Sequence, residues 1–110
     1  MIVSTTNTIA QRKIVRTLGL VRGTTVRGRH LGRDLLAHLR NAVGGEIVEY
    51  TKMLSEAREQ ALDRMVEEGR SLGADSIVGV RFSTSMTMAG AAEVVVYGTA
   101  VQTELLDSAG

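Results

Sequence analysis

The 110-residue sequence predicts a small α+β fold, with an antiparallel sheet of three to four strands packed against two helices in β-α-α-β-β order. Two stretches carry apolar residues at helical spacing, and two β-rich stretches joined by a short glycine-containing connection follow them. The chain has no cysteine and few aromatic residues, so aliphatic side chains must fill its core. This length fits a single domain over residues 1–110.

The N-terminal third predicts two extended segments. Residues 2–6 are mostly β-branched and favour a short strand. Residues 13–27 form a longer β-prone run that contains Gly19 and Gly23. Glycines inside a strand often mark a bulge, so we expect one long strand that is bent or bulged at these two positions.

The middle of the chain predicts two helices. The first covers about residues 31–43 and ends at Gly44-Gly45, and the second covers about residues 46–72 and ends at Gly73. The second helix has one apolar face and one charged face. Its buried face is expected to comprise Ile47, Tyr50, Leu54, Ala57, Ala61, Met65, Gly69 and Leu72.

The last two strands are expected at residues 75–85 and 93–103, joined as a hairpin. The run Val94–Tyr97 places apolar side chains on both faces of its strand. Helices on one side of the sheet would cover only one of these faces. We therefore expect homo-oligomerisation to cover the other face.

Charge is divided unevenly along the chain. Residues 1–45 contain eight arginines and lysines but one acid, Asp34, whereas the remainder contains five basic and eleven acidic residues. Neutralisation within the chain or between subunits is favoured over a polyanion such as nucleic acid, because stacking aromatic residues do not accompany the basic ones. The N-terminus does not resemble a signal peptide and the sequence lacks a bilayer-length apolar stretch, so we expect a cytoplasmic protein with no membrane partner.

One weak metal-ligand pattern is present. His30, Asp34 and His38 are spaced by four residues, which places them along one side of the first expected helix. A divalent metal would need further donors from elsewhere in the chain or from another subunit. Capping or solvent-exposed roles are favoured for these residues, and the sequence indicates no other cofactor.

The sequence contains no recognisable catalytic constellation, so we do not expect an enzyme. The carboxylates of the second helix are interpreted as its solvated face. Arg58, Arg81 and Glu93 are more prominent, because each is a charged residue on or beside an apolar element. An ion pair at a subunit contact is favoured for them over a functional group.

Several strings, taken in order, carry a family resemblance: Gly19-Leu-Val-Arg-Gly23, Gly32-Arg-Asp34, Glu56-Ala-Arg58, Leu72-Gly-Ala-Asp75, Val78-Gly-Val-Arg-Phe82 and Val94-Val-Val-Tyr-Gly-Thr-Ala-Val101. Over nearly the whole chain the sequence resembles the YbjQ-like family. The resemblance implies a β-α-β-β type subunit in a ring-shaped homopentamer, a label of heavy-metal binding, and no established biochemical role.

The resemblance also bears on individual residues. Arg33, Asp34, Arg58 and Glu93 fit the family pattern and become candidates, with Arg81, for a shared polar site or subunit contact. Ser83 stands where the family commonly has an acidic residue. We therefore expect a homo-oligomeric structural or ligand-binding module for an unidentified small ligand or partner. The alternative is a divalent metal-binding protein with a site between subunits.

Overall fold

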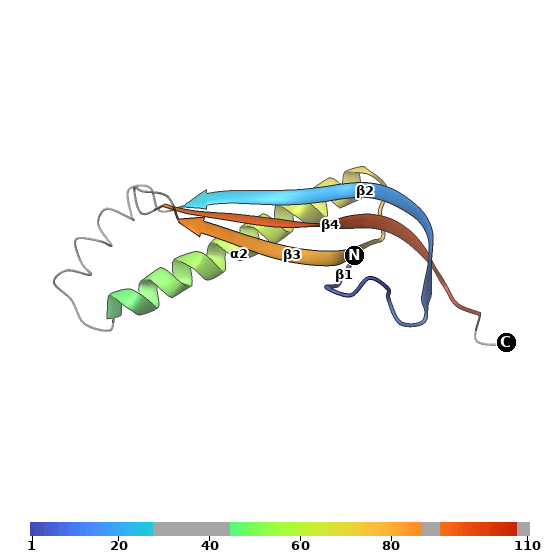
Figure 1. Cartoon of the computed structure of the whole chain (residues 1–110), viewed down its shortest axis with the longest axis horizontal. Coiled ribbons are helices and arrows are strands. Elements are labelled where there is room, and N and C mark those ends of the chain that lie inside the picture. Colours follow the sequence, from blue (N-terminus) through green and yellow to red (C-terminus); the bar gives the residue numbers. More distant parts are fainter. Residues whose placement is uncertain (28–44, 87–90, 108–110) are drawn as a thin grey trace.

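The computed structural model describes residues 1–27, 45–86 and 91–107, with helix side chains placed from residue 51. It has an α+β architecture, as the sequence predicts, in which one helix lies on one face of a four-stranded sheet (Figure 1). The sheet order is β1-β3-β4-β2. The elements are β1 (Ile2–Val3), β2 (Arg12–Arg27), α2 (Gly45–Ser71), β3 (Ser76–Met86) and β4 (Ala92–Leu105).

The sheet is mixed, so the prediction of a wholly antiparallel sheet was wrong. β2 and β3 both pair antiparallel with β4, but β1 runs parallel to β3. β1 and β3 are far apart in the chain, so no hairpin turn forces them to run in opposite directions. Its backbone amides bond to carbonyls on and beside β3, from Ile2 to Asp75 at 3.1 Å and from Ser4 to Ile77 at 2.9 Å.

Helix α2 confirms the second helix expected from the sequence, whereas the first expected helix, residues 31–43, lies outside the described residues. The end of α2 is fixed by a Schellman motif: the amide of Ala74 donates to the carbonyl of Gly69, and that of Gly73 to Arg70. Gly73 has a φ of 87°, which glycine adopts readily. The prediction that Gly73 stops this helix is confirmed.

The buried stripe of α2 packs against β2 and β4. Ala57, Ala61 and Met65 are fully buried, as the helical spacing predicts. Leu72 was expected in this stripe but is 46% exposed, because the helix ends one residue before it. Gly23 of β2 lies directly beneath the helix: a Cβ built there would come 1.9 Å from the carbonyl oxygen of Ala61.

Strand β2 is bulged near one of its two interior glycines. Its pairing with β4 shifts between Ile14 and Arg16 and again between Thr17 and Gly19, where φ is 124°. The pairing is continuous through Gly23, so the expected distortion there was wrong. Gly23 instead provides the close approach between sheet and helix.

The molecule is elongated rather than round. Its principal extents are 64 × 24 × 16 Å and its radius of gyration is 18.1 Å, whereas a compact chain of this length has a radius of about 13 Å. The first turns of α2 project past the sheet, and the far ends of β2 and β4 curl away from the helix (Figure 1). In the described part of the chain, no helix is long and apolar enough to cross a membrane.

Candidate functional site

The described residues leave the face of the sheet opposite α2 uncovered. Side chains alternate along β4, so Val94 and Val96 are fully buried beneath the helix, whereas Tyr97 points the other way and is 41% exposed. The expectation that β4 is apolar on both faces is confirmed. We call this surface the open face, defined by Leu20, Arg22, Thr24, Val26, Arg81, Ser83, Ser85, Glu93, Val95, Tyr97 and Thr99.

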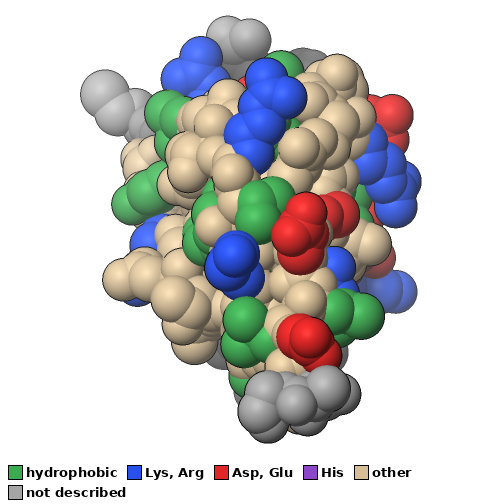
Figure 2. Space-filling view, turned by 90° about the vertical axis from the view of Figure 1, so that its right-hand side faces the viewer, with side chains coloured by type: hydrophobic (Ala, Val, Ile, Leu, Met, Phe, Trp, Pro, Cys, Tyr) green, Lys and Arg blue, Asp and Glu red, His purple; other side chains and the backbone are tan. Residues whose placement is uncertain are grey.

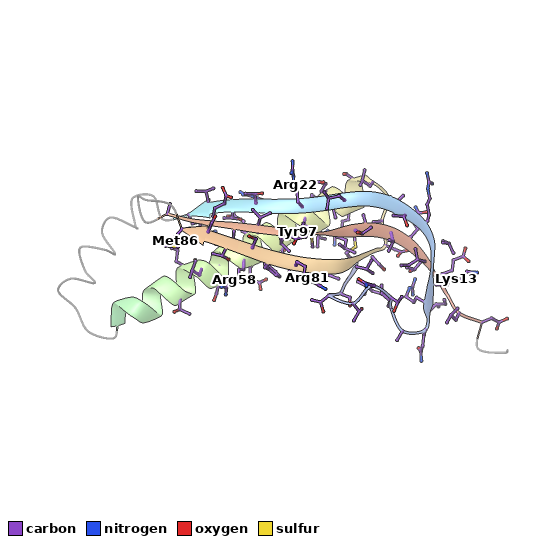
Figure 3. All side chains as sticks on the ribbon, viewed as in Figure 1. Lys13, Arg22, Arg58, Arg81, Met86 and Tyr97 are labelled. Atoms are coloured by element: carbon purple, nitrogen blue, oxygen red, sulfur yellow. The ribbon has the colours of Figure 1, made fainter. Side chains whose placement is uncertain are left out.

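The centre of the open face is a row of three side chains across three strands. Tyr97 on β4 is the Cα partner of Arg22 on β2 and of Arg81 on β3 (Figure 3). Directly opposed residues of antiparallel strands have Cβ atoms about 5 Å apart. Tyr97 therefore has an arginine as its neighbour on each adjacent strand, with the exposed apolar residues Leu20 and Val26 on either side of Arg22 along β2.

The two arginines differ in how they are held. Arg81 donates from Nη1 to the carbonyl oxygens of Thr5 and Val80, both at 2.8 Å, and these bonds orient its guanidinium. Arg22 is exposed on the edge strand. In the described residues neither arginine forms an ion pair.

The structure separates the predicted site residues that it describes. Arg81 and Glu93 both lie on the open face, but Arg81 pairs with Tyr97, four residues along β4 from Glu93. Arg58 is exposed on α2, in the other layer, so these three do not form one site within a chain (Figure 3). Residues 28–44, which include Arg33, Asp34, His30 and His38, lie outside the described residues.

Sequence reasoning missed a polar cluster at the base of the sheet. The carboxylate of Asp75 accepts hydrogen bonds from Ser76 Oγ and Thr103 Oγ1, both at 2.9 Å, and from the backbone amide of Thr103. Thr103 Oγ1 in turn accepts from Arg12 Nε at 2.6 Å. Partial burial by itself raises the pKa of Asp75, but these hydrogen bonds and the charge of Arg12 outweigh it, so the pKa lies below its ordinary value.

This cluster has a structural role. It joins the start of β2, the turn after α2, the start of β3 and the end of β4. Ser76 and Thr103 are buried, which leaves little room for a substrate. In the sequence Asp75 stood out only as the first residue of an expected strand and the last of a family string, because its partner Thr103 is 28 residues away.

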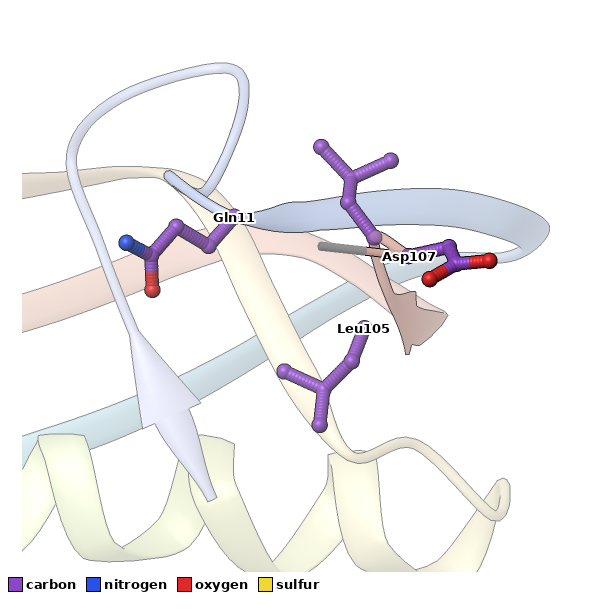
Figure 4. A pocket seen from close by; sticks show the side chains of 4 residues that line it. Gln11, Leu105 and Asp107 are labelled. Carbon is purple, nitrogen blue, oxygen red and sulfur yellow. The ribbon is translucent and has the colours of Figure 1, made fainter. Parts of the chain in front are cut away.

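A pocket of about 360 Å³ opens near the C-terminal end of β4, lined by Gln11, Leu105, Leu106 and Asp107 (Figure 4). Its only ionisable side chain is that of Asp107, so these four residues supply no acid–base pair. Figure 2 shows the end of the molecule on the right in Figure 1, where acidic side chains lie among the basic ones. That view contains no continuous basic patch for a polyanion.

The family is identified by comparison with known sequences. The family model YbjQ_1, described as "Putative heavy-metal-binding", matches residues 1–104. The chain belongs to the YbjQ_1 family. A UPF0145 protein of Methanosarcina acetivorans is 58% identical over 102 residues, covering 93% of this chain and 96% of that protein. One from Thermus thermophilus is 55% identical over 104 residues, covering 94% and 91%.

A solved structure shares the fold of this YbjQ_1 chain. It is a protein of unknown function of the DUF74 family from Pediococcus pentosaceus, with a TM-score of 0.64 and 18% identity over 94% of this chain and 98% of that one. At this identity the likeness concerns the fold alone. The names of these relatives assign no reaction.

The described residues do not fit the heavy-metal site that the family description implies. No three His, Asp or Glu side chains come together among residues 1–27, 51–86 and 91–107. The chain also has no cysteine, which soft heavy-metal ions prefer. The carboxylate of Asp75 is occupied by hydrogen bonds from Ser76 and Thr103 rather than free for a cation.

Proposed function

We propose that this YbjQ_1 chain acts as a homo-oligomeric structural or ligand-binding module, in which a second copy covers the open face. The observation that carries the proposal is the exposure of Leu20 (66%), Val26 (57%) and Tyr97 (41%) on the face opposite α2. On the helix side, by contrast, Val21, Val94 and Val96 of the same two strands are fully buried. Clustered apolar side chains on a β-sheet face mark an interaction surface. The partner in this proposal is the chain itself.

The shape of the chain also supports association. A two-layer subunit of 110 residues has a thin core, and an elongated one buries less surface than a round one. Here a single layer of helix covers one side of the sheet. A second subunit on the open face would complete a third layer and bury the flanks of Tyr97.

The finer features of the proposal follow the family resemblance. They are a ring-shaped pentamer in the cytoplasm, and a second helix over residues 31–43 that restores the β-α-α-β-β order. Five is an odd number, so such a ring requires contacts between two different surfaces of the chain rather than twofold ones. Native mass spectrometry of the full chain would count the subunits, and any stable number other than five would replace the pentamer.

Light scattering coupled to size-exclusion chromatography tests the assembly itself. We expect a mass several times that of the 11.8 kDa chain at micromolar concentration. Replacement of Tyr97 by Glu should lower this mass, because it places a charge at the centre of the covered surface. Leu72→Glu is the matched control, since Leu72 is similarly exposed but lies beyond the end of α2. A folded 11.8 kDa monomer of the unmodified chain would refute the proposal.

Divalent metal binding between subunits is the second candidate, favoured by the family description and by the spacing of His30, Asp34 and His38. Elemental analysis of the purified protein, followed by titration with nickel, zinc and copper, tests it. Replacement of both histidines by alanine should abolish binding. The absence of stoichiometric metal in every titration would end this candidate.

A further inference from the structure

We infer that the open face of one copy binds the outer face of α2 in the next copy, with Arg22 and Arg81 pairing with Glu59 and Asp63. The inference rests on the proposed homo-oligomer and specifies which two surfaces meet. It follows from unpaired charges of opposite sign on the two outer sides of the subunit, together with the apolar residues around them.

The basic side of the contact is the row of Arg22, Tyr97 and Arg81. No described carboxylate pairs with either arginine. Arg81 uses one nitrogen, Nη1, for its backbone acceptors, which leaves Nε and Nη2 available as donors. Leu20 and Val26 add exposed apolar surface on the neighbouring strand, so this face carries both charge and hydrophobic area.

The acidic side is a stripe on α2 that points away from the sheet. Glu56 pairs with Arg27 at 3.3 Å and Glu67 with Arg70 at 3.8 Å. Glu59 and Asp63, one turn apart on the same stripe, have no ion-pair partner in the part of the chain that the structure describes. Half-buried Leu62 and Val66 flank the stripe and supply apolar surface beside these two carboxylates.

The two sides cannot meet within one chain. Ala57, Ala61 and Met65 face the sheet, so a helical period of 3.6 residues turns Glu59 and Asp63 to the opposite side. The open face is the outer surface of the other layer. Contact between these surfaces therefore requires two copies stacked sheet on helix, and a repeated contact of this heterologous kind closes a ring or extends a filament.

The spacing of the charges is compatible with this contact. The Cα atoms of Arg22 and Arg81 are two strand separations apart, about 10 Å. Glu59 and Asp63 are four residues apart on a helix, about 6 Å between Cβ atoms. The length of the arginine side chains bridges the difference, and Tyr97 between them can lie over the turn that joins the two carboxylates.

A phosphate polyanion is the competing occupant of the same arginines. The second copy is favoured because Glu93 lies on the open face and would repel phosphate, whereas Leu20 and Val26 suit a protein surface. Tyr97 is also the only aromatic residue among those that define the open face, and single-strand binding sites stack successive bases on several aromatic rings.

A charge swap in the full-length chain tests the contact. The variants are R22E/R81E, E59R/D63R and the quadruple combination, with K13E/R16E as a control of equal charge change at the far end of β2. Mass by light scattering is measured across a dilution series, and circular dichroism checks that each variant is folded. R22Q/R81Q, which removes charge without reversing it, replaces the first variant if that one does not fold.

We expect each double variant to raise the dissociation constant of the assembly about tenfold or more, and the quadruple variant to recover most of the loss. The control should leave the mass unchanged. Suppose that the unmodified chain assembles and that folded R22E/R81E or R22Q/R81Q assembles with the same affinity. This result would overturn the contact but leave the homo-oligomer standing. A monomeric unmodified chain would remove both.

Two further outcomes also decide against the inference. The first is a folded quadruple variant that stays as weak as the doubles, since charge complementarity would then not be the cause. The second is a pair of results. The mass of the assembly is the same for R22E/R81E as for the unmodified chain, and a fluorescent oligothymidylate binds the unmodified chain but not R22E/R81E. That pair of results would assign the two arginines to a polyanion.

Discussion

The backbone amide of Thr103 donates to both carboxylate oxygens of Asp75, at 2.9 Å and 3.2 Å. The two residues are far apart in the sequence, one in the turn after α2 and one near the end of β4. Because the Thr103 hydroxyl and Ser76 bond to the same carboxylate, this contact fixes the register of β3 against β4. The group is therefore a structural clamp rather than a catalytic acid.

The clamp predicts a pH dependence of stability. The folded-state pKa of Asp75 is below its unfolded value, so its ionised form contributes stability above the ordinary pKa, and this contribution is lost as the pH falls through the lowered folded-state pKa. Asp75→Asn should lower the free energy of unfolding by about 1–3 kcal/mol at neutral pH. It should also weaken the decrease of this free energy as the pH is lowered, which we call the acid limb. Urea unfolding from neutral to acidic pH measures both effects. An unchanged acid limb in the variant would mean that other carboxylates cause it.

A second prediction concerns the buried hydroxyl of Thr25. It is 2% exposed beneath α2, and its Oγ1 has no hydrogen-bond partner among the residues that the structure describes. Thr25→Val keeps the shape of the side chain and removes the unsatisfied group, so we expect about 1 kcal/mol of added stability by urea unfolding. Thr103→Val is the matched control and should destabilise, because that hydroxyl bonds to both Asp75 and Arg12. Equal effects of the two substitutions would contradict this account.

A third prediction concerns the closest approach of helix and sheet. Gly23→Ala places a methyl group against the backbone of Ala61 and Met65, which cannot move without displacing α2. We expect a loss of about 3 kcal/mol or more in the free energy of unfolding, at the upper end for overpacking. Thr24→Ala, on the exposed side of the same strand, should change stability by about 0.5 kcal/mol. Similar thermal midpoints for the two variants would show that the layers can separate freely.

A fourth prediction concerns the residue directly before the long strand β2. Gln11 has a φ of 65°, the only positive φ of a non-glycine residue in the described ranges, and its carbonyl accepts from the amide of Leu106. Gln11→Gly should stabilise by about 0.5–1 kcal/mol, since glycine adopts this conformation without steric cost. Ala10→Gly, whose backbone is not in this region, should destabilise instead. Thermal unfolding of the two variants distinguishes them.

Local signals predicted several elements well. The stop at Gly73 follows from a motif of six consecutive residues, and the stripe of Ala57, Ala61 and Met65 follows from the helical period alone. The two-faced character of β4 likewise follows from alternation along one strand. The role of Gly23 did not, because a glycine beneath a helix and a glycine at a bulge give the same letter in the sequence.

The amino-acid sequence by itself determined the element types, the long helix with its buried stripe, and a strand that is apolar on both faces, because each depends on residues close together in the chain. The parallel pairing of β1, the clamp of Asp75 with Thr103, and the row of Arg22, Tyr97 and Arg81 were decided only by the tertiary structure. These features depend on the register between segments tens of residues apart. A shift of one residue in the pairing register of a strand would turn all of its side chains to the opposite face. Local composition does not encode that choice.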